Sequence, residues 1–455
     1  MNTVDRSCLP AVGPPALFRP PQLRHTRLTN GVDVFTATHH RAPVLTLKLL
    51  LPVGAADDPD NRHGLAALTG DILDEGTCQL TDVDLHKALT RIGAHLGIVV
   101  SSDATTLTLT TLAKHAREAV ALLLDVVAHP RLSSDDIARV RDLRCNRILQ
   151  MRQVPSAVAD RVFMKSVYGS HPYGHLSIGT HTALSEIDAS AVTEFHSRCY
   201  QATGWTLVAV GDMSHDRLLE TVQSEIDRVV QGASSSPFVP GSRLQEPPTV
   251  KNRLVFVPRP DAVQSEVRLG HPGVSRISED YHALLVLNMV LGGQFVSRIN
   301  LNLREDKGYT YGAHTSFDFR VGRGPFSFRS SVQTSVTAAA IREAIQEIQD
   351  IQTTRLPTSH ELRVARDALT RGFPRGLETA SQVARVGTTL ALHGLPVDEM
   401  DNFVQRVMAV DLDRVVAAAG THLHPDKLVT VVVGSADEVL PSLETLGLGT
   451  PYLVE

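Results

Sequence analysis

The sequence predicts an α+β protein built from two similar domains, and three observations lead to this prediction. The chain has 455 residues, which is too long for one ordinary domain of roughly 150 residues. Residues 133–142, which begin Ser-Ser-Asp-Asp-Ile and end Arg-Asp, have a counterpart at 358–367, which begins Thr-Ser-His-Glu-Leu and ends Arg-Asp; the offset is 358 − 133 = 225. Residues 232–248 are rich in Gly, Ser and Pro, as linkers are. We therefore expect domains at 1–231 and 249–455, with a linker at 232–248.

The elements of the first half follow from local patterns. Asn30-Gly31 predicts a hairpin turn, and residues 44–53 form an apolar run typical of a strand. Residues 99–112 alternate Thr or Ser with Leu, which predicts one half-exposed strand. Residues 205–211 predict a buried strand that closes the unit. Helices are expected at 64–75, 85–92, 118–127 and 134–150.

The closing strand supports the repeat independently. Its final Gly211 has a counterpart in Gly434, at an offset of 434 − 211 = 223. The Ser/Thr-x-x-acid patterns at 133 and 358 also match helix capping boxes, so shared helix-start chemistry is an alternative explanation for them. A nearly constant offset at such separated positions favours a true internal repeat.

The most informative segment is 291–312, LGGQFVSRINLNLREDKGYTYG. After Gly292 and Gly293, a mixed segment leads to a glycine turn and then to an alternating, strand-like run. We expect Arg304 at a helix end and Tyr311 at the entry to a strand. A guanidinium offers five donors and a permanent charge, and a phenol can donate to a developing oxyanion, so the pair can grip a peptide carbonyl. A surface arginine and a packing tyrosine are the alternative, and the commoner case for such a pair taken alone.

The run Leu303-Arg304-Glu305-Asp306-Lys307-Gly308-Tyr309-Thr310-Tyr311 resembles the arginine/tyrosine segment of the insulinase/pitrilysin peptidases, the inverzincins. In that family the tyrosine follows the arginine by seven positions, and here 311 − 304 = 7. Gly292-Gly293 resembles the family's glycine-rich approach to this segment, and further short matches extend over nearly the whole chain. The resemblance implies two domains, each a mostly antiparallel sheet packed with helices, which together form half of a clamshell.

The zinc motif of that family is absent here. Active inverzincins carry H-x-x-E-H directly after Gly-Leu-Ala, and here Gly-Leu-Ala is followed by Ala67-Leu68-Thr69-Gly70-Asp71. Ala67 and Asp71 stand in place of the two histidines, and Gly70 in place of the glutamate base. The later segment 143–148, where a further carboxylate ligand is expected, contains no acid. We expect no metal and no other cofactor in this chain, with zinc bound by a partner subunit instead.

The resemblance implies the non-zinc-binding subunit of a heterodimeric zinc metalloendopeptidase whose partner carries H-x-x-E-H, with the isolated chain inactive. Tyr311 would donate to the scissile carbonyl oxygen and Arg304 would anchor a neighbouring substrate group. Gly292 and Gly293 would let a loop approach the substrate backbone, although a tight turn explains them equally well. Two alternatives of other classes are an inert structural subunit, like the core proteins of the bc1 complex, and a module that presents peptides to a separate protease.

Composition limits the partners and the compartment. The net charge is −5 and no block of like charges occurs, which argues against nucleic acid or an anionic membrane as a partner. Four cysteines, widely spaced, indicate free thiols of a reducing compartment. No secretion signal and no membrane-spanning apolar run is recognisable, so we expect a cytoplasmic protein.

Overall fold

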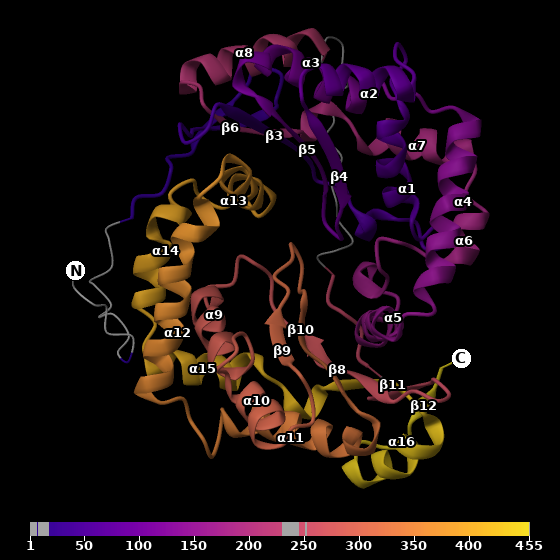
Figure 1. The fold of residues 1–455 in the computed structure, drawn as a ribbon, viewed down its shortest axis with the longest axis vertical. Coiled ribbons are helices and arrows are strands. Elements are labelled where there is room, and N and C mark those ends of the chain that lie inside the picture. Colours follow the sequence, from indigo (N-terminus) through magenta and orange to yellow (C-terminus); the bar gives the residue numbers. More distant parts are fainter. Residues whose placement is uncertain (1–6, 8–17, 230–244, 251–252, 455) are drawn as a thin grey trace.

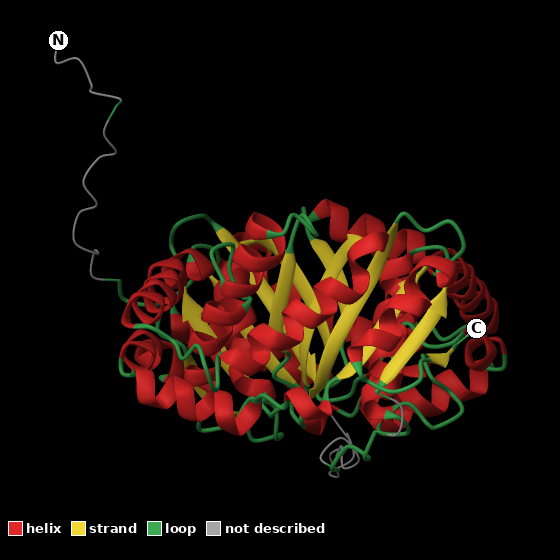
Figure 2. Cartoon of the chain, turned by 90° about the horizontal axis from the view of Figure 1, so that it is seen from below, coloured by secondary structure: helices red, strands yellow, loops and turns green. Residues whose placement is uncertain are grey.

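Two six-stranded sheets, each packed with helices, form the centre of the molecule (Figures 1 and 2). The structure, a computed structural model, describes residues 7, 18–229, 245–250 and 253–454. The predicted α+β class, with mostly antiparallel pairing in each sheet, is confirmed. Most of the predicted linker 232–248 lies outside the described residues, and the domain boundaries that it defines stay predictions.

The first sheet has the strand order β1-β2-β6-β3-β5-β4. Strands β2 and β6 pair in parallel, and the other neighbours pair antiparallel. Its strands are β1 (Arg24–Arg27), β2 (Asp33–Thr38), β3 (Val44–Leu51), β4 (His95–Val100), β5 (Thr105–Leu112) and β6 (Thr206–Gly211).

The second sheet repeats this arrangement in the order β12-β7-β11-β8-β10-β9. Strands β7, β11, β8, β10 and β9 occupy the places of β2, β6, β3, β5 and β4, so the repeat in the sequence is a repeat of structure. The strands are β7 (Leu254–Pro258), β8 (Gln264–Pro272), β9 (Ala313–Phe317), β10 (Pro325–Gln333), β11 (Val429–Gly434) and β12 (Tyr452–Leu453).

The helices follow the same repeat. Those of the first half are α1 (Leu65–Ile72), α2 (Asp82–Arg91), α3 (Ala116–Ala128), α4 (Ser134–Met151), α5 (Pro155–Tyr168), α6 (His181–Ser185), α7 (Ala189–Cys199) and α8 (His215–Val229). Those of the second half are α9 (Tyr281–Leu291), α10 (Arg298–Asn300), α11 (Thr337–Asp350), α12 (Ser359–Gly372), α13 (Ala380–Leu392), α14 (Glu399–Met408), α15 (Leu412–His422) and α16 (Ala436–Leu443).

The turn between β1 and β2 agrees with the sequence prediction, and the turn between β4 and β5 does not. The Asn30-Gly31 hairpin is confirmed: Gly31 has φ = 87° and joins the antiparallel β1 and β2. The prediction of a single strand over 99–112 is wrong, because the chain turns between β4 and β5. The Ser101 side-chain oxygen accepts hydrogen bonds from the backbone N–H groups of Asp103 (3.3 Å) and Ala104 (3.0 Å), which closes that turn.

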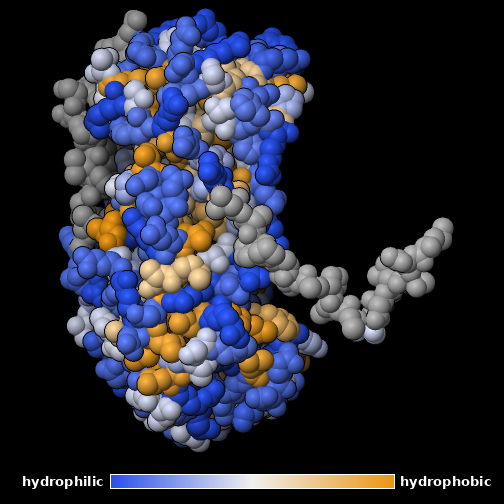
Figure 3. Space-filling model, turned by 90° about the vertical axis from the view of Figure 1, so that its left-hand side faces the viewer, coloured by the Kyte–Doolittle hydropathy of each residue, from blue (hydrophilic) through white to orange (hydrophobic). Residues whose placement is uncertain are grey.

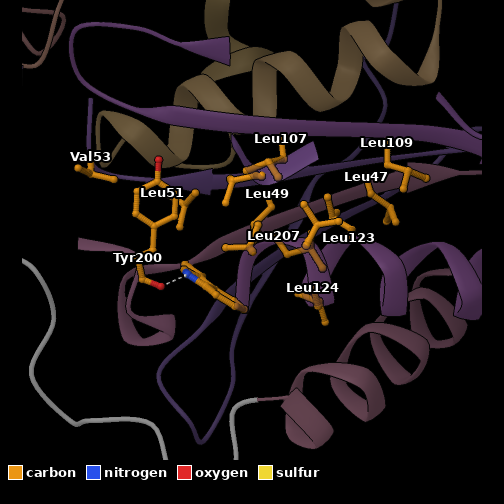
Figure 4. Packing of buried hydrophobic residues seen from close by; sticks show 14 of the residues in the cluster. Leu47, Leu49, Leu51, Val53, Leu107, Leu109, Leu123, Leu124, Tyr200 and Leu207 are labelled. Atoms are coloured by element: carbon orange, nitrogen blue, oxygen red, sulfur yellow. Dashed lines mark hydrogen bonds between the residues drawn. The ribbon is translucent and has the colours of Figure 1, made fainter. Parts of the chain in front are cut away.

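The core of the first half lies between one face of its sheet and the helices outside it. Alternate residues of β3, Leu45 to Leu51, are buried on this face, as the period of two requires. Figure 4 shows several of these leucines against Leu107, Leu123 and Leu207. The dashed line in that figure marks the hydrogen bond from the Trp205 indole N–H to the backbone oxygen of Tyr200 (3.2 Å), which satisfies a buried donor.

On the opposite face, each sheet is covered by a helix from the other half. Helix α13 of the second half packs on β3 and β6, and α5 of the first half packs on β8 and β11 (Figure 1). Val208 and Val210 of β6 form one apolar cluster with Val383 and Ala384 of α13. The two halves therefore exchange a helix, and neither sheet is fully covered by its own half.

On the face seen in Figure 3, the apolar side chains of the described residues form separate patches among hydrophilic ones. In the part of the chain that the structure describes, no helix combines the length and the apolar character needed to cross a membrane.

Candidate functional site

The segment 291–312 begins where α9 ends against β9. The backbone N–H groups of Gly292 and Gly293 both donate to the Asn288 carbonyl, at 2.9 and 2.7 Å. A β carbon at Gly292 would lie 2.5 Å from Oγ1 of Thr315, and one at Gly293 would lie 2.6 Å from the Asn288 amide nitrogen. The φ of Gly292 is −159°, so close packing, rather than a left-handed backbone, requires glycine there. The close neighbour of Gly292 is β9 of the same chain; a substrate contact at this pair stays a prediction.

Arg304 lies in a π-helical turn, Leu301–Asp306, that continues from α10. Its position near a helix end agrees with the sequence prediction, and π turns are frequent at functional sites. The guanidinium carbon lies 4.2 Å from the centre of the exposed Phe295 ring, and Nε lies 3.5 Å from a carboxylate oxygen of Glu305. The side chain is 33% exposed, so the ring orients a guanidinium that remains open to a ligand. Phe295 was missed by the sequence analysis; the only available signal was an aromatic residue soon after the glycine pair.

Tyr311 lies in a bend immediately before β9, held by hydrogen bonds of its neighbours. The Thr310 hydroxyl donates to the Ser331 carbonyl (2.7 Å) and accepts from the Gly312 N–H (3.1 Å). The Ser330 hydroxyl donates to the Gly312 carbonyl (3.0 Å). The Tyr311 side chain itself is 91% exposed, and no hydrogen bond joins it to another described residue. The bend breaks the expected strand alternation, so the strand starts two residues later than predicted.

Asn300 links the helical side of the segment to the strand side. Its side-chain oxygen accepts the backbone N–H of Ala313 at 3.0 Å, and its amide donates to the Gln294 carbonyl at 3.2 Å. The side chain is buried. Asn300 therefore fixes the start of β9, just after Tyr311, relative to the helix that carries Arg304.

The base of the same segment is fixed by an ion pair between the buried Arg298 and the half-buried Glu361. Arg298 is 7% exposed and meets Glu361 through two hydrogen bonds, Nε to Oε1 at 2.6 Å and Nη2 to Oε2 at 2.9 Å. Glu361 also accepts the backbone N–H of Thr358 at 2.8 Å, which caps α12. Burial by itself raises the pKa of Glu361, but the hydrogen bonds from Arg298 and Thr358 outweigh it and lower this pKa to about 2.

We expect this pair to make stability depend on pH in acid. A carboxyl whose pKa is depressed in the folded state stabilises the protein above its unfolded-state pKa, near 4.5, and loses this contribution as the pH falls towards the folded-state value. The urea midpoint should therefore fall more steeply from pH 4.5 to 2.5 in the parent than in Glu361→Gln. Equal pH profiles for the two proteins would contradict the assignment, and Asp367→Asn, at an exposed acid of the same helix, is the control.

The degenerate zinc positions lie on α1. Ala67 is buried, and a β carbon at the buried Gly70 would lie 2.6 Å from a methyl group of Val100. Asp71 forms an ion pair with Arg144 of α4. Arg144 also donates to the carbonyl of Ser177 at 2.9 Å. The structure thus brings position 71 and the segment 143–148 together, through a guanidinium rather than a metal.

These residues do not fit a zinc ion. A guanidinium beside Asp71 repels a divalent cation and uses the one carboxylate present. Within residues 18–229, 245–250 and 253–454, no group of three or more His, Cys, Asp or Glu side chains is placed to hold a metal ion.

Comparison with known families and proteins gives consistent matches. Residues 33–181 match the insulinase family, peptidase family M16, and residues 186–369 match the peptidase M16 inactive domain. An uncharacterized zinc protease of Mycobacterium tuberculosis is 26% identical over 414 residues, which cover 90% of this chain and 93% of that protein. A protein of Helicobacter pylori named a non-peptidase homolog is 22% identical over 422 residues, covering 91% and 94%.

Two solved structures share the fold. A crystal structure of a peptidase M16 inactive domain from Pseudomonas fluorescens superposes with a TM-score of 0.83 at 24% identity, covering 91% of this chain and 98% of that one. A protease from Helicobacter pylori superposes with a TM-score of 0.83 at 18% identity, covering 91% and 99%. At these identities the superpositions establish the two-domain architecture.

Proposed function

Because the chain belongs to the insulinase family, peptidase family M16, we propose that it is the non-zinc-binding subunit of a heterodimeric zinc metallopeptidase and supplies Arg304 and Tyr311 to peptide hydrolysis. The observation that carries the proposal is a contrast between the two halves. In the first half, an ion pair between Asp71 and Arg144 occupies the place where active members of the family bind zinc. In the second half, the guanidinium of Arg304 and the phenol of Tyr311 are accessible to a ligand.

The geometry supports a role for Tyr311 as a donor. Its backbone neighbours are fixed by hydrogen bonds to β10, so the backbone needs no ordering when a ligand meets the hydroxyl and only the side-chain torsions of Tyr311 have to be fixed. A phenol on such a backbone can donate to a carbonyl oxygen as negative charge develops on it. Zinc and a glutamate base of the partner subunit would supply the attacking hydroxide.

Arg304 suits the binding of a second substrate group. Stacking on Phe295 covers one face of the guanidinium, and its edge donors remain available to a carbonyl or carboxylate. Arg298, by contrast, already donates two hydrogen bonds to Glu361. Of these two arginines of the segment, Arg304 is therefore the one suited to bind a ligand.

A second candidate function is a non-catalytic subunit that binds or presents peptides, or only supports assembly. The observation that favours it is the degenerate zinc site itself, together with the match of 186–369 to a domain described as inactive. The two functions differ in one measurable respect: only the first requires Tyr311 for turnover.

The proposal is tested by combining this chain with an M16 chain that carries H-x-x-E-H. We expect the two to co-purify as a one-to-one complex that holds zinc and cleaves short unfolded peptides. This chain alone should hold no stoichiometric zinc and cleave none. A chelator should abolish cleavage by the complex. Zinc bound by this chain alone, or a complex that binds peptides without cleaving them, would contradict the proposal.

A further inference from the structure

The tips of two corresponding hairpins, β4–β5 and β9–β10, meet where the halves join. The Asp103 carboxylate, between β4 and β5, accepts the Tyr173 hydroxyl at 2.6 Å and the backbone N–H of Val321 at 3.0 Å. The N–H of Gly322 donates in turn to the Tyr173 hydroxyl at 2.9 Å. In Figure 1 the turn between β9 and β10 reaches towards the first sheet. This contact fixes the two halves relative to each other.

A cavity of about 630 Å³ lies beside this contact. Its walls come from both halves: α4 and the loop 176–178 from the first, the turn 318–320 and the end of α13 from the second. The volume falls in the range of small-ligand sites. It is separate from the Arg304–Tyr311 segment, which contributes no residue to its lining.

Of the three arginines among the described residues that line this cavity, two are paired with carboxylates and Arg147 is not. Arg144 is engaged by Asp71, and Arg320 donates from Nε to Asp318 at 2.8 Å. Arg147 lines the cavity one helical turn after Arg144 and is exposed. Among the described residues, no side chain or carbonyl is hydrogen-bonded to Arg147 or paired with it.

The remaining lining suits a group that is apolar on one side and anionic on the other. Met151, Leu176 and Leu392 contribute apolar surface, and Ser102 and Ser177 contribute hydroxyl groups. His393 adds no charge at neutral pH, because burial and, to a lesser extent, Arg276 lower its pKa to about 4.

We propose that this cavity binds the C-terminal carboxylate of a short peptide with an apolar last residue, and that Arg147 holds the carboxylate. The Arg147 guanidinium matches a carboxylate with two parallel hydrogen bonds, while the last side chain packs against Met151, Leu176 and Leu392. The unpaired Arg147 guanidinium, with Asp103 and Asp318 in the same described lining, suits a single negative charge better than a phosphate. The inference gives a substrate class to the proposed peptidase subunit, and the biological role of the cavity rests on that proposed function.

Direct binding to this chain alone tests the inference. The probes are a fluorescent pentapeptide ending in leucine, the same peptide with a C-terminal amide, and inorganic phosphate as a competitor. We expect the free acid to bind at least about tenfold more tightly than the amide, as a charge-assisted pair provides. Arg147→Gln should remove this preference and leave the binding of the amide unchanged. Arg152→Gln, which removes the same charge from an exposed residue just beyond α4 and outside the cavity lining, is the matched control.

Equal affinity for acid and amide, an unchanged preference in Arg147→Gln, or displacement of the peptide by millimolar phosphate would each overturn the inference. The measurement needs no partner and no turnover. If the chain bound the free acid selectively but the complex did not cleave peptides, only the proposed function would be contradicted. If the complex cleaved peptides but the chain showed no preference for the free acid, only this inference would be contradicted.

Discussion

Replacing Tyr311 by phenylalanine is expected to lower kcat of the reconstituted complex by about 10²–10³, with a much smaller change in KM. Loss of one oxyanion donor typically has an effect of this size, and an interaction made mainly in the transition state affects kcat rather than binding. The substitution removes only an oxygen atom from a side chain that is 91% exposed, so the fold should be unchanged. Steady-state hydrolysis of a quenched fluorescent peptide by the complex measures both constants.

Tyr309→Phe provides the control for this experiment. It removes the same hydroxyl two residues away, from a side chain that is half-buried against the core of the second half. We expect parental kinetics from this variant. If Tyr311→Phe hydrolysed the peptide at the parental rate as well, Tyr311 would not be a catalytic residue, and the peptide-presenting alternative would be favoured.

Truncation of Phe163 to alanine is expected to lower the free energy of unfolding by about 3–5 kcal/mol, the range for a large aromatic residue in a core. Phe163 is 1% exposed and extends from α5 of the first half onto the second sheet. The fit is tight, because a β carbon at Gly270 of β8 would lie 2.7 Å from the edge of the Phe163 ring. Urea denaturation followed by circular dichroism measures the change.

The same substitution at Phe295 is the matched control for stability. Phe295 is 59% exposed and contacts Arg304 rather than a core, so its removal should lower stability by no more than about 1 kcal/mol. Similar losses in the two variants would show that the exchanged helix α5 does not contribute as a core element.

Local rules in the sequence were sufficient for much of the fold. The hairpin at Asn30-Gly31 follows from a residue pair that tolerates positive φ, and the repeat followed from matching helix starts at Ser133 and Thr358, both of which cap helices in the structure. The turn between β4 and β5 was missed because it contains neither Gly nor Pro; the Ser101 side chain makes it instead. The exchange of α5 and α13 was out of reach, because amphipathicity shows that a helix face is buried but not which sheet buries it.

The candidate site, like the fold, could be predicted from the sequence only in part. Spacing placed Arg304 near a helix end and Tyr311 near a strand, since both depend on residues close in sequence. The side chains that hold the two parts of the site in place make contacts between residues far apart in the sequence, which local sequence patterns do not reveal. Glu361 reaches Arg298 from 63 residues away, and Arg144 reaches Asp71 from 73 residues away. No short-range signal announces such pairs.

The exchange of helices has a consequence for how this chain is made. During translation the first sheet is complete once residue 211 has emerged, but one of its faces, with Phe35, Val208 and Val210, awaits residues 380–392. A nascent first half therefore exposes apolar strand surface until most of the polypeptide has left the ribosome. Chaperones should therefore capture nascent chains that are stalled after residue 211 has emerged. This capture should end once residues 380–392 have emerged and α13 can pack on the first sheet.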